Sequence, residues 1–312
     1  LMENSSMWFK NLRVYTFAKP LAQSFEEIET ALADKLFEPC GSMEKARLGW
    51  VSPLGREGEM LSHVQGPYLM LCSQKQERLL PAAVVNEATE EKVAELEERQ
   101  GRKIYRKEKR QIRDDVFVTL LPRAFTRNQQ TFAYLSLADN MLIVNSSSAP
   151  KAEELITLLR DTLGSLPVEI PSTNRAPADV MTRWLREQHG SDNFVIDEEC
   201  ELFNPIDGGN VVRCKGQDLF SEEIQAHLGA GKQVKSLGVT WNSVVSCVLS
   251  EDLSVKRVKF VGMNEERDQG DAESAAEKFD QEFAVMTLQL TDFLKDFITA
   301  FGGLEQGADA SA

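Results

Sequence analysis

A long segment without internal proline, residues 82–121, places the strongest constraint on the fold. It is rich in Glu, Lys, Arg, Ala and Leu, which have high helix propensities, so the sequence predicts one or two long helices there. Gly101 is the expected break, because glycine inside a helix costs about 1 kcal/mol relative to alanine. We therefore expect a helical extension over residues 76–121.

The sign of the charge reverses inside this segment. Residues 87–98 hold six glutamates and one lysine, whereas residues 99–113 hold eight basic residues and a single acid, Glu108. On one continuous helix all eight would fall within about 160° of arc. These basic residues are Arg99, Arg102, Lys103, Arg106, Lys107, Lys109, Arg110 and Arg113.

Such a basic stripe indicates an anionic partner. Its predicted i,i+4 neighbours, such as Arg102–Arg106 and Arg106–Arg110, carry like charges, which mildly destabilise a helix. Nucleic acid is the favoured partner, because a cationic face can follow a phosphate backbone. A solvated or intersubunit face is the main alternative. An acidic membrane surface is the weakest alternative, since the opposite face lacks the Trp, Phe and Leu residues that an interfacial helix would bury.

The overall charge sharpens this interpretation. The net charge of −14 alone argues against nucleic-acid binding, because phosphates repel an acidic protein. Residues 99–127, however, hold ten basic residues and only three acids, so the positive charge is segregated. Hydrophobic residues make up 42% and charged residues 27% of the chain, which is ordinary for a globular protein of two or three units.

Hydrophobic periodicity predicts an α+β fold, a mixed α/β multi-domain subunit with antiparallel sheets and a long helical segment. Ser24 and Glu27 resemble a capping box that opens a helix over 25–38. Expected strands are 8–17, 47–52, 68–74, 131–137, 141–146, 166–170, 211–215, 234–241, 244–250 and 254–261. Further expected helices are 150–163, 178–188, 221–228 and 273–301.

The Pro-, Ser- and Asn-bearing stretch 171–177 marks an expected domain boundary. We expect a central α/β domain, a helical tip and a second α+β (base) domain. Residues 1–6 are interpreted as an added or alternative start, and 304–312 as a disordered tail. The expected ranges are 7–75 plus 122–170 for the central domain, 76–121 for the tip and 171–303 for the base.

Motifs for catalysis or metal binding are not apparent. The five cysteines contain no CxxC pair and the three histidines lie far apart, which favours buried thiols in a reducing cytoplasm over a zinc site or a disulfide framework. Residues 229–233 lack the glycine and the hydroxyl residue of a phosphate-binding loop. We expect no catalytic residue, cofactor or metal, although acidic residues are plentiful enough that a metal-dependent nuclease stays a distant alternative.

Taken in order, several segments resemble the recombination-associated RdgC family over residues 7–303. They are "MWFKNLRVY" (7–15), "PCGS" (39–42), "GWV" (49–51), "LLPRAF" (120–125), "TLLRDTLGSLPV" (157–168), "DGG" (207–209), "QDL" (217–219) and "SEEI" (221–224). The resemblance implies a ring-shaped homodimer that encircles duplex DNA without sequence preference. It also implies a cytoplasmic, nucleoid-associated protein that limits the access of RecA to DNA and has no membrane partner. Binding of single-stranded DNA is left open.

The resemblance extends the predicted site beyond the stripe. It implies that Arg123 and Phe125 lie near a dimer contact beside the hole, with Phe125 in the interface. Arg213, Lys215 and Gln217 alternate, so they would share one strand face, and by the resemblance that face meets DNA. From the pattern alone an ordinary exposed strand face is the preferred reading. Arg127 completes the predicted DNA-binding set.

A rival function from another class is a protein-interaction adaptor. In that case the basic stripe would bind an acidic partner or the glutamate-rich residues 87–98 of its own chain. Such a protein would self-associate in a salt-sensitive way and have no affinity for DNA.

Overall fold

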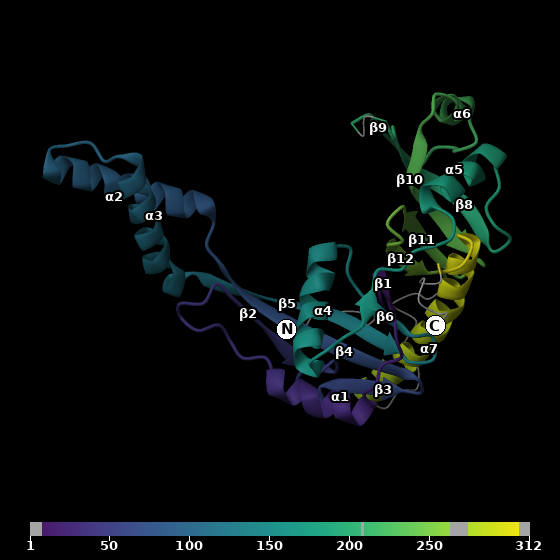
Figure 1. Ribbon diagram of the computed structural model, residues 1–312, viewed down its shortest axis with the longest axis horizontal. Helices are drawn as coiled ribbons and strands as arrows, with labels where there is room; N and C mark the ends of the chain where they lie inside the picture. Colours follow the sequence, from purple (N-terminus) through teal and green to yellow (C-terminus); the bar gives the residue numbers. More distant parts are fainter. Residues whose placement is uncertain (1–7, 207–208, 263–273, 306–312) are drawn as a thin grey trace, which may run out of the picture.

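The computed structural model describes residues 8–206, 209–262 and 274–305 (Figure 1). It confirms a mixed α/β fold with a large antiparallel sheet. The sheet strands are β1 (Asn11–Phe17), β2 (Ala46–Val51), β3 (Ser62–Gln65), β4 (Tyr68–Leu79), β5 (Phe125–Ser136), β6 (Met141–Val144), β7 (Val168–Glu169), β8 (Phe194–Phe203), β9 (Val211–Lys215), β10 (Gln233–Trp241), β11 (Val245–Ser250) and β12 (Val255–Phe260).

The helices and short 3-10 turns connect these strands. The α-helices are α1 (Phe25–Leu32), α2 (Ala82–Gln100), α3 (Arg106–Leu120), α4 (Ala149–Leu163), α5 (Pro177–Glu187), α6 (Glu222–Gly229) and α7 (Ala275–Ala300). The 3-10 turns are η1 (Ala33–Lys35), η2 (Gly55–Glu57) and η3 (Leu121–Arg123). In the described ranges, no helix is both long and apolar enough to cross a membrane.

The strand order is β2-β4-β5-β6-β1-β12-β11-β10-β8-β9, with β3 beside β4 and β7 beside β1. β1 is the junction: it pairs with β6 on one side and with β12 on the other. The β12 contact has only two aligned residue pairs, Asn11 with Lys256 and Leu12 with Val255. The first and last of the described strands therefore hold the two halves of the sheet together.

The half of the sheet formed by β2, β4, β5, β6 and β1 is called the central half, and it is covered on both faces. Alternate side chains of its strands, such as Leu69 and Leu71 of β4, pack with α1 and α4 in one buried cluster. The intervening residues, such as Met70, face the other way and pack with Phe283 and Met286 of α7. This two-sided burial follows from the period of two along a strand.

The second half, β8 to β12, is covered on one face only. Its inner side chains pack with α5, α6 and α7 around Phe293 and Leu237. The outer face carries alternating charged residues and stays accessible to solvent, as is common for antiparallel sheets. The predicted closing helix is confirmed as α7, whose residues at three- and four-residue spacings lie in this core: Phe283, Met286, Leu290, Phe293, Leu294 and Phe297.

The arm, α2 with α3, projects from the far ends of the long strands β4 and β5 (Figure 1). These strands pair without interruption from Tyr68–Ser136 to Leu79–Phe125. Figure 1 also shows that the arm and the β8–β9 end lie at opposite ends of the molecule and project to the same side of the central strands.

Several element boundaries differ from the predictions. The helix expected over 25–38 ends at Leu32, after the confirmed Ser24–Glu27 capping box, and continues only as η1. β4 and β5 are longer than expected, because their polar ends carry the arm and need no apolar pattern. β8 was not predicted at all, since Glu198, Glu199 and neighbouring acids obscure its alternation.

The two predicted terminal segments lie mostly outside the described residues. Leu304 bridges to Thr173, and the backbone N–H of Glu305 donates to the Ser172 carbonyl, at 2.8 Å. Residues 1–7 and 306–312 lie outside the described residues, so the interpretations of 1–6 and of the tail beyond Glu305 remain predictions.

Candidate nucleic-acid interface

The predicted basic stripe is divided between two helices. α2 ends at Gln100, and Gly101 caps it in the left-handed conformation, with φ of 61°. Glycine adopts this conformation without the steric cost that other residues incur. α3 starts only at Arg106. The expectation of eight basic residues on one continuous helical face is therefore wrong, although the break at Gly101 is confirmed.

α3 begins with an unfavourable arrangement of charge. Arg106 and Lys107 occupy its first turn, and Lys109 and Arg110 follow directly. The N-terminal end of a helix is electropositive, so cations placed there are destabilised. The helix itself therefore does not favour these cations, whereas an anion bound near this end would.

Glu108 compensates part of this charge. Its carboxylate accepts two hydrogen bonds from the Arg102 guanidinium, at 2.8 and 3.0 Å, and one from the Tyr105 backbone N–H, at 3.3 Å. These hydrogen bonds lower the pKa of Glu108 to about 2, and the bond from Arg102 has the largest effect. Arg102 is thus partly neutralised and fixed at the turn between α2 and α3.

α3 lies beside α2 with few charged contacts between them. The Lys109 Nζ is 4.0 Å from a Glu90 carboxylate oxygen, and the Arg113 Nε donates to the Asn86 Oδ1 at 3.2 Å. Apart from Glu90, the acids of α2 are not within ion-pair distance of α3. The acidic helix α2 therefore neutralises little of the basic stripe. Within the described ranges, six exposed stripe residues have no acidic partner at ion-pair distance: Arg99, Lys103, Arg106, Lys107, Arg110 and Arg113.

The base of the arm carries an exposed apolar and basic surface. Phe125, the first residue of β5, is 85% exposed, and Leu79 opposite it is 43% exposed. Arg78 holds this corner by donating to the carbonyls of Pro122 and Ala124. Arg123 is exposed in η3.

Arg127 lies two residues after Phe125 on β5 and is already paired. It forms an ion pair with Glu77, directly opposite on β4. This contact engages its charge on the strand surface, unlike the charge of the exposed Arg123.

The outer face of β8 and β9 also carries predicted site residues. Arg213 and Lys215 are exposed on the same face of β9, as expected. The Arg213 Nε donates to Glu201 on β8 at 2.8 Å, which lowers the pKa of Glu201. Lys215 lies opposite Glu199, which is paired instead with Arg257 of β12. Lys215 is therefore the freer of the two β9 cations.

Gln217 does not share this strand face. β9 ends at Lys215, and Gly216 then turns the chain with φ of 64°. The half-buried Gln217 donates through Nε2 to Glu223 of α6, at 2.9 Å. Its predicted placement as the third residue of an alternating row is wrong, because the turn at Gly216 interrupts the period of two.

Sequence reasoning missed the acidic row that faces these cations. Asp197, Glu199 and Glu201 alternate along β8, and Lys235 of β10 approaches Glu201 at 3.5 Å. The alternation of three acids was the available signal. Burial raises the pKa of Asp197, and this effect outweighs the hydrogen bond that the Thr240 hydroxyl donates to its carboxylate. This face is therefore close to self-neutralised, and the arm holds the less compensated positive charge.

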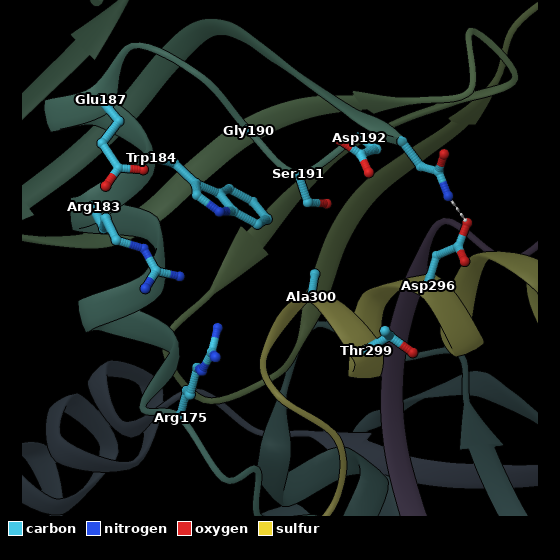
Figure 2. A pocket seen from close by; sticks show the side chains of 11 residues that line it. Arg175, Arg183, Trp184, Glu187, Gly190, Ser191, Asp192, Asp296, Thr299 and Ala300 are labelled. Atoms are coloured by element: carbon cyan, nitrogen blue, oxygen red, sulfur yellow. Dashed lines mark hydrogen bonds between the residues drawn. The ribbon is translucent and has the colours of Figure 1, made fainter.

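A pocket of about 500 Å³ lies apart from these residues, between α5 and the end of α7 (Figure 2). Arg175 and Arg183 point toward it, together with the carboxylates of Glu187 and Asp192. Asp296 accepts hydrogen bonds from Asn193 and from the Trp241 indole. The lining mixes both signs of charge and contains none of the predicted site residues.

The described residues contain no group of three or more His, Cys, Asp or Glu side chains that could hold a metal ion. Their cysteines, Cys40, Cys72, Cys200, Cys214 and Cys247, are all free, and all but the half-buried Cys40 are buried.

Comparison with known proteins identifies relatives over nearly the whole chain. Residues 7–304 match the family model described as "Putative exonuclease, RdgC". The recombination-associated protein RdgC of Tolumonas auensis is 42% identical over 298 residues, covering 95% of this chain and 99% of the relative. The RdgC proteins of Aeromonas hydrophila and Psychromonas ingrahamii are 41% and 42% identical over 301 and 299 residues, covering 96% and 95% of this chain and 99% of each relative.

Proposed function

Because the chain belongs to the RdgC family of recombination-associated proteins, we propose that it binds DNA without sequence preference and thereby limits the access of RecA. The observation that carries this proposal is the set of uncompensated cations at the start of α3, where the helix dipole disfavours them. Phosphates would satisfy these charges without reading bases, so affinity would not depend on sequence. Binding to the nucleoid follows from the same property.

We further propose that two copies close into a ring around duplex DNA, with the arm and the β9 end as the contact regions. The arm supports this because it is poorly buried in one chain: α3 has no buried side chain, and α2 has only Val85 and Thr89. Phe125 adds a large exposed apolar side chain at its base. A partner copy would cover the apolar surface around Phe125, as expected for a dimer interface, and leave the cations of α3 to DNA.

We propose that the protein is not an enzyme. Positioning cations along a phosphate backbone requires no reacting group, and the proposed role needs only occupancy of DNA. The family model is described as an exonuclease, so this point should be checked directly. Labelled duplex incubated with the protein and Mg²⁺ or Mn²⁺ should stay intact. Cleavage that is lost when an acidic residue of the protein is substituted would contradict the proposal.

The binding test is a titration of two unrelated fluorescent duplexes by anisotropy at several salt concentrations. We expect equal affinities and a linear fall of log K with log salt. Changing Lys103, Arg106 and Arg110 together to Gln should weaken binding to both duplexes alike. The salt slope should fall by about three, one per lost phosphate contact.

The matched control changes Lys19 and Lys35, exposed cations near the two ends of α1, to Gln. This variant should keep the slope of the wild type, apart from the small effect of net charge. An unchanged slope in the α3 variant would remove these residues from the site. Absence of binding by the wild-type protein at low salt would instead support the adaptor.

A further inference from the structure

Two buried cysteines lie directly opposite each other on the last two strands of the sheet. Cys200 of β8 is aligned with Cys214 of β9, and both thiols are free. Cys200 is 2% exposed and Cys214 is 7% exposed. The aligned pairs on either side, Glu199–Lys215 and Glu201–Arg213, belong to the outer face. Since side chains alternate along a strand, the two cysteines share the inner face.

This alignment gives the two cysteines a Cα spacing that a disulfide can span. Directly opposite residues of antiparallel strands have Cα atoms about 4.5–5.5 Å apart. Disulfides span Cα separations of about 4.4–6.8 Å, so the Cα spacing fits. They also need Cβ atoms about 3.5–4.5 Å apart, slightly closer than the roughly 4.5–5.5 Å usual for opposite residues, so the edge strand must shift slightly when the bond forms. The two thiols already interact: burial and then the neighbouring Cys214 raise the pKa of Cys200 to about 12.

The position of β9 provides a route for a reagent. β9 is the edge strand, and among the described strands β8 alone pairs with it. Cys214 therefore lies in a five-residue strand that is held on one side, and edge elements of this kind open locally more readily than central strands. Opening would expose the Cys214 thiol while Cys200 stays in place on β8.

The other cysteines are excluded as partners. Cys247 lies on β11, and β10 separates β11 from β8, so their backbones are about 9–10 Å apart. Cys72 lies on β4, in the other half of the sheet, and Cys40 interacts there with the Gln76 backbone carbonyl. Gln76 is four residues from Cys72 along β4, or about 13 Å, so Cys40 and Cys72 are also too far apart to form a disulfide. Any intramolecular disulfide of the native fold is thus restricted to Cys200 and Cys214.

We propose that Cys200 and Cys214 form a dithiol site that a low-molecular-weight disulfide oxidises to a cross-strand disulfide. The thiolate of Cys214 attacks the reagent, releasing one reduced thiol and leaving a mixed disulfide. Cys200, once deprotonated, then attacks the Cys214 sulfur and releases the second reduced thiol. In total, two protein thiols become one disulfide, and one reagent disulfide becomes two thiols.

Oxidation would fix the edge of the sheet. The bond links β9 covalently to β8, so β9 can no longer separate fully. Its backbone amides should exchange hydrogen more slowly in the oxidised protein, whereas those of β11 should not change. This inference does not depend on DNA binding, and its test has no DNA readout.

The full-length native protein is incubated with oxidised glutathione for longer than its β9 amides take to exchange hydrogen. This time ensures that β9 has opened during the treatment. Remaining thiols are then alkylated and the peptides are mapped by mass spectrometry. We expect two fewer alkylated thiols, a mass lower by two hydrogens before alkylation, and one linked peptide pair containing Cys200 and Cys214. Adding a reduced thiol should reverse the change.

Variants assign the site. Cys214→Ala should abolish the linked pair, and Cys40→Ser, a matched control in the other half of the sheet, should keep it. The wild-type peptide map decides the question even if Cys214→Ala folds poorly. Five thiols that remain free after β9 exchange, or a linked pair that involves any other cysteine, would overturn the proposal.

Discussion

At the scale of single residues, Glu108 balances the turn between α2 and α3. Its pKa is lowered from 4.5 to about 2, so it is ionised and hydrogen-bonded at neutral pH. A group with a lowered pKa stabilises the fold above its ordinary value, and this contribution is lost as the pH falls from about 4.5 through about 2. The start of α3 should therefore lose order within this acidic window.

Glu108→Gln tests this directly. The amide cannot form the charged pair with Arg102, so the amides at the start of α3 should exchange faster at neutral pH than in the wild type. The difference between the two proteins should vanish as the wild-type carboxylate becomes protonated. Hydrogen exchange between pH 7 and pH 2 measures both effects.

The control is Glu95→Gln, which removes the exposed pair with Lys92 on α2 and should leave the start of α3 unchanged. Equal protection of α3 in Glu108→Gln and wild type at pH 7 would refute the role of Glu108.

Residue-level predictability depended on local rules. The Ser24–Glu27 capping box was readable because both partners lie within one helical turn. The ion pairs of Arg127 and Arg213 were not, because Glu77 and Glu201 approach them only through strand register. Sequence alone therefore named the cations but could not separate the paired ones from the free ones.

At the scale of elements, Gly101 determines that the arm is a helical hairpin. Its φ of 61° is in the left-handed region, which costs other residues about 1 kcal/mol. Gly101→Ala should therefore weaken the turn, and the amides between α2 and α3 should exchange about five times faster. Hydrogen exchange of residues 101–105 measures the effect.

Gly229→Ala is the matched control. Gly229 is the last residue of α6, has no positive φ, and its added Cβ would meet no atom within 4 Å. This change should leave the arm unaffected. If the two variants exchange alike at residues 101–105, the turn does not depend on the conformation of Gly101.

Element-level predictability followed the strength of the hydrophobic pattern. α7 was predicted well because its apolar residues face one core along its whole length. β8 was missed because its outer face is acidic, and the order of the strands could not be read because β1 pairs with β12 across almost the entire sequence. Contacts of that separation leave no local signal.

At the scale of the whole molecule, Phe125 is the sharpest test of the proposed ring. If it lies in a dimer interface, Phe125→Asp should bury an unpaired charge there and weaken the dimer about 30-fold or more. Sedimentation equilibrium of wild type and variant measures this change. Loss of the dimer should also lower DNA affinity, because a single chain cannot encircle a duplex.

Leu288→Asp serves as the control, because Leu288 is 63% exposed on α7, outside the proposed contact regions. It should sediment like the wild type. A wild-type protein that is monomeric at micromolar concentrations, or a dimer that tolerates Phe125→Asp, would contradict the proposed contact.

The junction at β1 has a consequence for how the protein is made. β1 leaves the ribosome long before its partner β12, which begins only at Val255. During synthesis β7 can pair with Thr16 and Phe17 on this edge of β1, but Asn11 and Leu12 must wait, unpaired, until β12 has emerged. Unpaired strand edges attract other strands, so nascent chains of this protein should depend on chaperones, and truncation before residue 255 should yield insoluble material.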